Sequence, residues 1–182
     1  MRRILGITFS DGNNMCGSVG HGKGEIKKWI EEQLDIKTIV DVGAGSATYP
    51  QLLGDKYKYK AIEIWAPYIE MWGLEKYYDE IRIGDVRYIK FPKGDCIIFG
   101  DILEHMGKED ALEVIRRANS FYKHMVISIP LSERDEITPS KIHYGNWFEK
   151  HISAWTFEEL EGLVNWDFKR AVHRGQMGIF TK

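Results

Sequence analysis

The strongest constraint on the fold is an alternation of short apolar strands with helical segments. We expect strands at residues 38–42, 59–64, 80–83, 95–99 and 125–129. Apolar residues at helical spacing, with Pro67 in one first turn, predict helices at residues 25–34, 47–53, 67–77 and 108–119, the last with Leu112 and Ile115 on one side. Strands that alternate with helices form a parallel sheet that is covered on both faces.

The end of the chain breaks this alternation. Expected strands at residues 164–173 and 176–181 are joined by a tight turn at Arg174-Gly175 with no helix between them, so they must form an antiparallel hairpin. Thr156 and Glu159 form a capping box that begins a helix before the hairpin. The prediction is an α/β fold with a doubly wound, mostly parallel seven-stranded sheet, an antiparallel C-terminal hairpin strand and helices on both faces.

Length and composition fit one domain over residues 1–182. Five glycines in residues 10–24 predict a flexible N-terminal segment over residues 1–24, and an irregular stretch at 131–153 is expected on the acceptor side. Cys16 and Cys96 form no metal or disulfide pattern, and no apolar run reaches a membrane span of roughly 20 residues, so we expect a cytoplasmic location without a membrane. A net charge of -2 with interspersed charges argues against nucleic acid as a partner.

Acidic residues follow the ends of four successive expected strands. The first strand leads into Asp41-Val42-Gly43-Ala44-Gly45, whose glycines allow a sharp turn and the close approach of a ligand. Glu63 ends the second strand, 18 residues after Gly45, where a carboxylate can accept hydrogen bonds from both ribose hydroxyls. Asp85 and Asp101 follow the third and fourth strands. One such acid often only caps the next helix, but four together predict a nucleotide site.

Charge distinguishes between two candidate nucleotides. A dinucleotide fingerprint would have a third glycine at position 48, where Thr48 stands, and its pyrophosphate would be repelled by Asp41. S-adenosylmethionine (SAM) has no phosphate, and its ammonium and sulfonium groups are cations that Asp41 and Asp101 would attract. The sequence therefore favours SAM over NAD.

The first turn resembles motif I of the class I SAM-dependent methyltransferases, written D/E-x-G-x-G-x-G, with Ala47 in place of the third glycine. Glu63, Gly84-Asp85-Val86 and Asp101-Ile-Leu-Glu104-His105 are similar to the next three motifs of that family, and the resemblance spans about residues 25–182. It implies methyl transfer from SAM, S-adenosylhomocysteine as product, and a sheet whose seventh strand is antiparallel. Glu63 would hold the ribose, Asp85 and Val86 the adenine, and Gly43, Gly45 and Asp101 the methionine end. The full set of expected cofactor-binding residues is Asp41, Gly43, Ala44, Gly45, Glu63, Ile64, Asp85, Val86 and Asp101.

The acceptor side is less defined. Methyl transfer from a sulfonium needs mainly proximity and alignment, with a base only for a protonated acceptor, and His105, His143 and His151 are the candidate catalytic residues. Residues 13–24, 101–106 and the aromatic stretch 142–148 could form the acceptor pocket, although the aromatic residues could also cover the edge of the core. The Pro-Pro-aromatic and Pro-Cys motifs of DNA methyltransferases are lacking after the fourth strand, so we expect a small-molecule acceptor.

A metal site is an alternative reading of part of this region. Asp101, Glu104, His105 and His151 resemble residues of the small-RNA 3′-end 2′-O-methyltransferases, in which two glutamates and two histidines hold a divalent cation. Here Asp101 would replace the first glutamate with a side chain that is one methylene shorter. The competing interpretation, which we favour, is that His105 packs against the sheet, that Thr156 caps a helix, and that no metal binds.

Three other functions remain open at this point. The chain could be a non-catalytic protein with a SAM-binding fold, or a metal-assisted 2′-O-methyltransferase of RNA 3′ ends. An NAD-linked oxidoreductase is the weakest alternative, because of Thr48 and Asp41.

Overall fold

The structure is a computed structural model that describes residues 21–133 and 136–182. Cys16 and most of the expected glycine-rich N-terminal segment therefore lie outside the described residues.

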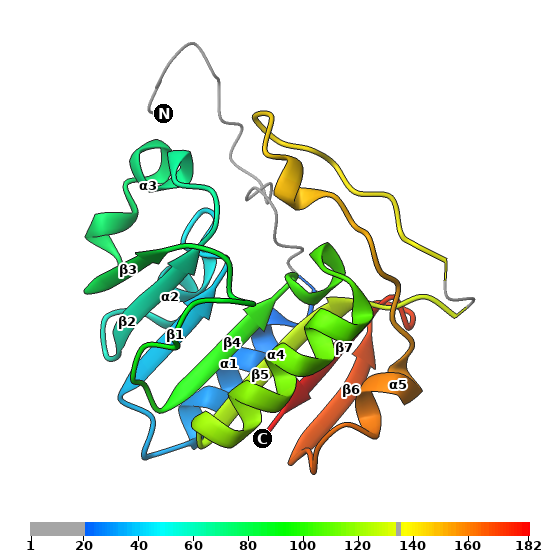
Figure 1. Ribbon diagram of the computed structural model, residues 1–182. Helices are drawn as coiled ribbons and strands as arrows, with labels where there is room; N and C mark the ends of the chain where they lie inside the picture. The colour runs from blue at the N-terminus through cyan, green and yellow to red at the C-terminus, as the bar shows by residue number, and fades with distance from the viewer. Residues whose placement is uncertain (1–20, 134–135) are drawn as a thin grey trace.

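Seven strands form one sheet in the order β3-β2-β1-β4-β5-β7-β6 (Figure 1). Strands β1 to β5 run parallel to one another, whereas β7 is antiparallel to both β5 and β6. The predicted fold class and the antiparallel seventh strand are thus confirmed. The strands are β1 (Thr38–Val42), β2 (Lys58–Glu63), β3 (Glu80–Ile83), β4 (Cys96–Gly100), β5 (His124–Pro130), β6 (Phe168–Val172) and β7 (Met177–Thr181).

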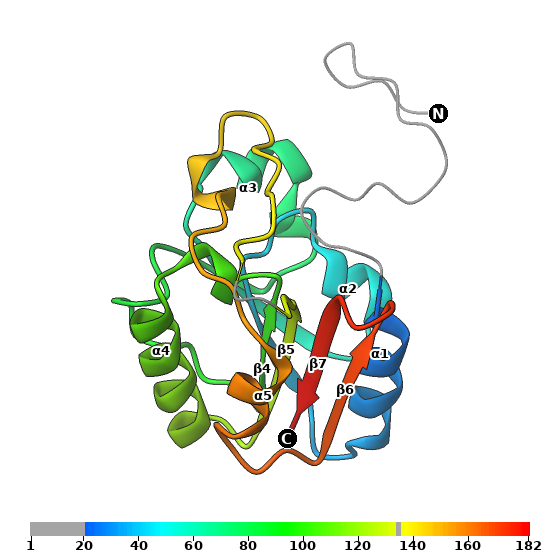
Figure 2. The ribbon, with the colours of Figure 1, turned by 90° about the vertical axis from the view of Figure 1, so that its right-hand side faces the viewer.

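Helices cover both faces of the sheet. Figure 2 shows α1 (Lys23–Glu32) and α2 (Thr48–Leu53) on one side, and α4 (Lys108–Phe121) and α5 (Phe157–Glu161) on the other. Successive strand residues point to opposite faces, so Ile39 packs with the α1 side while Val40 packs with the α4 side. Both residues are fully buried, which explains why the central strands carry unbroken apolar runs.

Two helix predictions had wrong boundaries. The helix expected over residues 67–77 ends at Trp72 as α3 (Pro67–Trp72), because Gly73 adopts a left-handed φ of 60° and a 3-10 helix, Leu74–Lys76, follows. The helix expected over residues 25–34 begins at Lys23 and ends at Glu32, which leaves Leu34 86% exposed outside its apolar stripe.

Two further expectations are also corrected. The strand expected from residue 164 begins at Phe168, because Val164 and Trp166 pack against the core on the α4 side instead of pairing with β7. On α4, Leu112 was expected on the buried face but is partly exposed, and Val114 joins Ile115 in the core in its place.

The strand order creates a crevice at the centre of the sheet. β1 and β4 are neighbours, but the chain leaves β1 toward β2 on one side and leaves β4 toward β5 on the other. In open sheets of this kind the loops after such strands diverge, and ligands bind between them. Among the described residues, no helix combines the length and apolar character needed to cross a membrane.

Candidate functional site

The turn after β1 has a backbone that depends on glycine. Gly43 and Gly45 have φ values of 74° and 47°, in the left-handed region that side chains disfavour. A Cβ on Gly43 would lie 2.0 Å from Cδ1 of Ile102, so the Ile102 side chain would have to shift to admit one. Ala47 occupies the place of the third glycine and still adopts a left-handed φ of 59°, at a cost of roughly 1–2 kcal/mol.

Glu63 is held in place by the turns around it. Its Oε2 accepts a hydrogen bond from the Gly45 amide at 3.2 Å, and its Oε1 accepts one from the Trp65 amide at 2.8 Å. The carboxyl is almost completely buried, and burial raises its pKa although the amide hydrogen bonds oppose the shift. Each oxygen keeps lone-pair capacity that a ligand hydroxyl could use.

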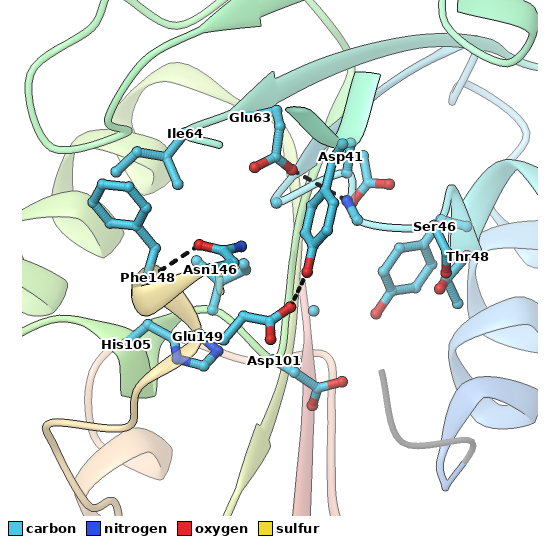
Figure 3. A pocket seen from close by; sticks show the side chains of 17 residues that line it. Asp41, Ser46, Thr48, Glu63, Ile64, Asp101, His105, Asn146, Phe148 and Glu149 are labelled. Atoms are coloured by element: carbon cyan, nitrogen blue, oxygen red, sulfur yellow. Dashed lines mark hydrogen bonds between the residues drawn. The ribbon is translucent and has the colours of Figure 1, made fainter. Parts of the chain in front are cut away.

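Asp41 is buried beside Glu63 (Figure 3). Its Oδ2 accepts a hydrogen bond from the Tyr78 hydroxyl at 2.6 Å. Burial raises the pKa of Asp41 to about 7, against the hydrogen bond from Tyr78 and the charge of Lys23. A cation bound nearby would reverse that shift by favouring the carboxylate.

Asp101 follows β4 and has an unusual backbone, with φ at 58°. Its Oδ2 lies 3.5 Å from Nζ of Lys23, the first residue of α1, and both side chains are buried. The same Nζ donates a hydrogen bond to the Tyr49 hydroxyl at 2.9 Å. This connection to α1 was not expected from the sequence, because no motif marks Lys23.

Two adjoining pockets lie over the carboxyl ends of the central strands. They contain about 640 and 500 Å3 of empty space, part of which is open to solvent. The first is bordered by Ser46 and Thr48 on one side and by Phe148 and Ile64 on the other, with Glu63 between them (Figure 3). The second is mainly apolar. The two pockets share Gly43, Ile64, Ile102, His105 and Phe148.

All nine expected cofactor residues line these pockets. Asp85 and Val86 line the second pocket, Gly43 and Ile64 line both, and the other five line the first. Asp85 is also paired with Arg87, whose guanidinium contacts both carboxylate oxygens and lowers the pKa of Asp85 against its partial burial. The role of these nine residues in binding a cofactor stays a prediction.

The three candidate catalytic histidines have different positions. His105 lines both pockets, whereas His143 and His151 line neither of them. Nδ1 of His105 lies 3.2 Å from the Lys150 carbonyl oxygen. Because a carbonyl oxygen can only accept a hydrogen bond, the ring proton lies on Nδ1 and Nε2 has a lone pair. Burial lowers the pKa of His105, so the ring is neutral at pH 7.

The sequence analysis did not single out Glu149 or Asn146, which also line the first pocket. They belong to residues 136–153, here called the acceptor-side segment. The Tyr68 hydroxyl on α3 donates a hydrogen bond to Glu149 Oε1, and the His143 amide donates to Oε2 at 2.7 Å. The aromatic stretch at residues 142–148 indicated this part of the chain, but it did not indicate Asn146 or Glu149 as pocket residues.

Glu104, His105 and His151 form a cluster behind the first pocket. Their potential ligand atoms all lie within 4.8 Å of one another. Glu104 is buried, and neither of its carboxylate oxygens has a hydrogen-bond partner within the described part of the chain. Nδ1 of His151 lies 2.9 Å from both the carbonyl oxygen and the hydroxyl oxygen of Thr138, and in the tautomer that donates to the carbonyl its Nε2 has a lone pair. Asp101, expected on the same face, is not a member of the cluster and pairs with Lys23 instead.

Comparisons with known proteins support the fold. No protein-family model and no curated protein sequence matches this chain. The N-terminal domain of EvdMO1 with bound S-adenosylhomocysteine matches 99% of this chain and 87% of its own length, with a TM-score of 0.66 and 12% identity. A SAM-dependent methyltransferase from Clostridium acetobutylicum covers 86% of this chain and 87% of its own length, with a TM-score of 0.65 and 13% identity.

Other similar structures are longer proteins. The chain spans 53% of a mitomycin 7-O-methyltransferase, with a TM-score of 0.59 and 15% identity over 88% of this chain. It spans 76% of a Burkholderia thailandensis 1,6-didemethyltoxoflavin-N1-methyltransferase, with a TM-score of 0.59 and 16% identity over 88% of this chain. These similarities show that the chain has the class I methyltransferase fold.

Proposed function

We propose that this protein is a SAM-dependent methyltransferase that transfers a methyl group to an oxygen or nitrogen of a small-molecule acceptor. The observation that carries the proposal is the pair of adjoining pockets, which share residues and are lined by all nine expected cofactor residues. The more polar pocket, near Asp41 and Asp101, suits the ammonium and sulfonium groups of SAM. Glu63 suits the ribose, and the more apolar pocket suits the adenine.

Methyl transfer from SAM requires few catalytic groups from the protein. SAM supplies an activated methyl group on its sulfonium, and the protein aligns an acceptor with it and excludes water. His105 is the residue that can take a proton from the acceptor, because it lines both pockets with a neutral ring and a free Nε2 lone pair. His143 and His151 would act only through neighbouring groups, since neither lines these pockets.

The acceptor-side segment is the proposed acceptor site. Phe148 borders the shared part of the pockets, and Tyr144 and Trp147 of the same segment are exposed. Aromatic surfaces of this kind bind flat or apolar molecules. Structural neighbours were determined with apigenin, 1,6-didemethyltoxoflavin or D-fucose, all of them small molecules. This agrees with a small-molecule acceptor.

Ligand-dependent stability tests the cofactor directly. S-adenosylhomocysteine and SAM should each raise the melting temperature of the purified protein, because a ligand that binds only the folded state stabilises it. NAD at the same concentration should not. A shift with NAD and none with either SAM compound would overturn the proposal. If SAM binds but no S-adenosylhomocysteine forms across a broad acceptor panel, the non-catalytic alternative is favoured.

A second candidate function is supported by the cluster of Glu104, His105 and His151. An unpaired buried carboxylate and two imidazoles with free Nε2 lone pairs fit a divalent transition metal such as Zn²⁺, Co²⁺ or Mn²⁺. Such an ion would supply a Lewis acid beside the acceptor. We propose on this basis that metal-assisted methylation of a hydroxyl, including the 2′-hydroxyl of an RNA 3′ end, is the alternative to metal-free transfer.

Metal content separates the two candidates. The protein is purified without chelators, and bound metals are measured in the wild type, in His105→Ala/His151→Ala, and in His143→Ala as a control outside the cluster. Stoichiometric metal that is lost only in the double variant, with circular dichroism unchanged, would favour the second candidate. If neither the wild type nor the control holds metal after incubation with each ion, the metal-free reaction stands.

A further inference from the structure

Lys23 is a buried cation whose role the proposed reaction does not yet explain. Its side chain is 7% exposed, and its Nζ contacts Tyr49 and Asp101. Burying a lysine is costly, and a buried ion pair adds little stability compared with apolar side chains of the same size. Packing alone therefore gives little reason for a lysine at this position.

The partners of Lys23 belong to the first pocket. Tyr49 and Asp101 both line it, as does Gly100, the last residue of β4. A Cβ on Gly100 would lie 2.4 Å from the Tyr49 hydroxyl oxygen, so the ring is packed directly on this glycine. Tyr49 accepts its hydrogen bond from Lys23, which leaves the hydroxyl proton of Tyr49 available to a ligand.

The first pocket also contains a second hydroxyl donor, on Ser46. Ser46 lines the pocket, and its Oγ is buried without a hydrogen-bond partner in the part of the chain that the structure describes. Ser46 lies next to Thr48, on the side of the pocket away from Phe148 and Ile64 (Figure 3). Hydroxyl donors backed by a lysine form a site for an anion, because each stabilises negative charge in a buried setting.

An α-amino acid carries the matching charges, with a carboxylate and an ammonium on the same carbon. We propose that Tyr49 and Ser46 donate hydrogen bonds to the α-carboxylate of the methionine part of SAM, that Lys23 supplies the opposing charge behind Tyr49, and that Asp101 accepts from the ammonium. This rests on the proposed function and adds the recognition of the amino-acid end. Lys23 is a positioning residue, which acts through Tyr49 and Asp101.

Ligand analogues that lack the carboxylate test the proposal. Calorimetry compares S-adenosylhomocysteine with its decarboxylated analogue, which keeps the amine, thioether, ribose and adenine. The wild type should bind S-adenosylhomocysteine more tightly. Lys23→Met should weaken that binding by about 10- to 100-fold, the usual range for a charge-assisted hydrogen bond, and should leave the affinity for the decarboxylated analogue unchanged or raised. Tyr49→Phe should show the same selectivity in a protein that keeps the ring.

Lys28→Met is the matched control, because it makes the same charge change at an exposed position of α1. An equal loss of affinity for both ligands in Lys23→Met would mean that Lys23 only supports the fold, and this would overturn the proposal. Unchanged affinity for both ligands would overturn it as well. A wild type that binds neither ligand would instead contradict the proposed function itself.

Discussion

Among the individual residues of the site, two buried carboxyl groups lower the stability of the folded protein but suit the binding of a ligand. Asp41 and Glu63 are buried, and burial raises the pKa of both. Burial makes the charged form of each carboxyl group costly, and a cation or hydroxyl donor that binds beside the carboxylate offsets part of that cost. The free energy of unfolding of the ligand-free protein should therefore depend on the protonation of these groups, and so on pH.

Asp41→Asn should reduce the pH dependence of stability. Burial raises the pKa of Asp41 to about 7, whereas in an unfolded chain it titrates near 3.8. Between these values the folded state binds more protons than the unfolded state, so the free energy of unfolding falls as pH rises from about 4 to 7. From pH 5 to pH 7 this amounts to about 2 kcal/mol for Asp41, which urea unfolding should find missing in the variant. Parallel pH curves for variant and wild type would contradict the assignment.

Glu63→Gln should weaken the binding of S-adenosylhomocysteine by about 1.5–3 kcal/mol, the usual value of hydrogen bonds to a charged group. Glutamine keeps the size of the side chain and one acceptor for the amides of Gly45 and Trp65. Glu75→Gln, at an exposed position, is the control for loss of charge. Calorimetry that shows equal affinities for Glu63→Gln and wild type would remove Glu63 from the ribose.

At the scale of elements, the turn between β1 and α2 shapes the pocket through its backbone. Gly43 has a left-handed φ, and a Cβ there would displace the Ile102 side chain, whereas a Cβ on Gly45 would meet only the Gly43 carbonyl oxygen at 3.7 Å. Gly24, in the first turn of α1, has no atom within 4 Å of an added Cβ and no left-handed φ. The same substitution at these three glycines should therefore have three different effects.

Alanine substitutions should separate these effects. Gly43→Ala should be the most destabilising, because the new methyl group overlaps Ile102. Gly45→Ala should cost roughly 1–2 kcal/mol through its left-handed backbone alone. Gly24→Ala should stabilise by about 0.5–1 kcal/mol, as expected within a helix. Thermal unfolding gives the order, and equal effects at positions 43 and 45 would show that the turn has been misplaced.

Gly45→Val should fold and yet lose binding of S-adenosylhomocysteine, because its branched side chain would project into the pocket that Gly45 lines. Circular dichroism checks the fold and calorimetry checks the binding. Native affinity in the folded variant would place the cofactor elsewhere.

At the scale of the whole molecule, the acceptor-side segment joins both halves of the sheet. It contacts α3 through Tyr68 and Glu149, and it leads into Trp155, which is buried in the core on the α4 side. Trp147, in the same segment, is 73% exposed. The chain that follows the segment is thus fixed by the core, whereas Trp147 within the segment is available to an acceptor.

Trp155→Ala should destabilise the protein by about 3–5 kcal/mol, because it leaves a large cavity in the core. Trp147→Ala should change stability by less than about 0.5 kcal/mol, as is usual for an exposed side chain. If Trp147 contacts the acceptor, its removal should lower methyl transfer without changing the affinity for S-adenosylhomocysteine. Denaturant unfolding measures the first pair of effects, and comparable losses of stability would contradict the burial of Trp155.

Local sequence patterns were sufficient to predict the alternating α/β architecture, the terminal hairpin and nine of the residues that line the two pockets. These features depend on local patterns, namely apolar strands, the glycines after β1 and acids at strand ends. Such patterns can be recognised in the sequence without knowledge of tertiary contacts. Tertiary structure alone decided that Lys23 faces Asp101, that Glu149 reaches the pocket, and that Glu104 lies beside His151. Each of these pairs joins residues that are far apart in the chain, so their meeting depends on how the sheet and its helices pack and not on any local spacing.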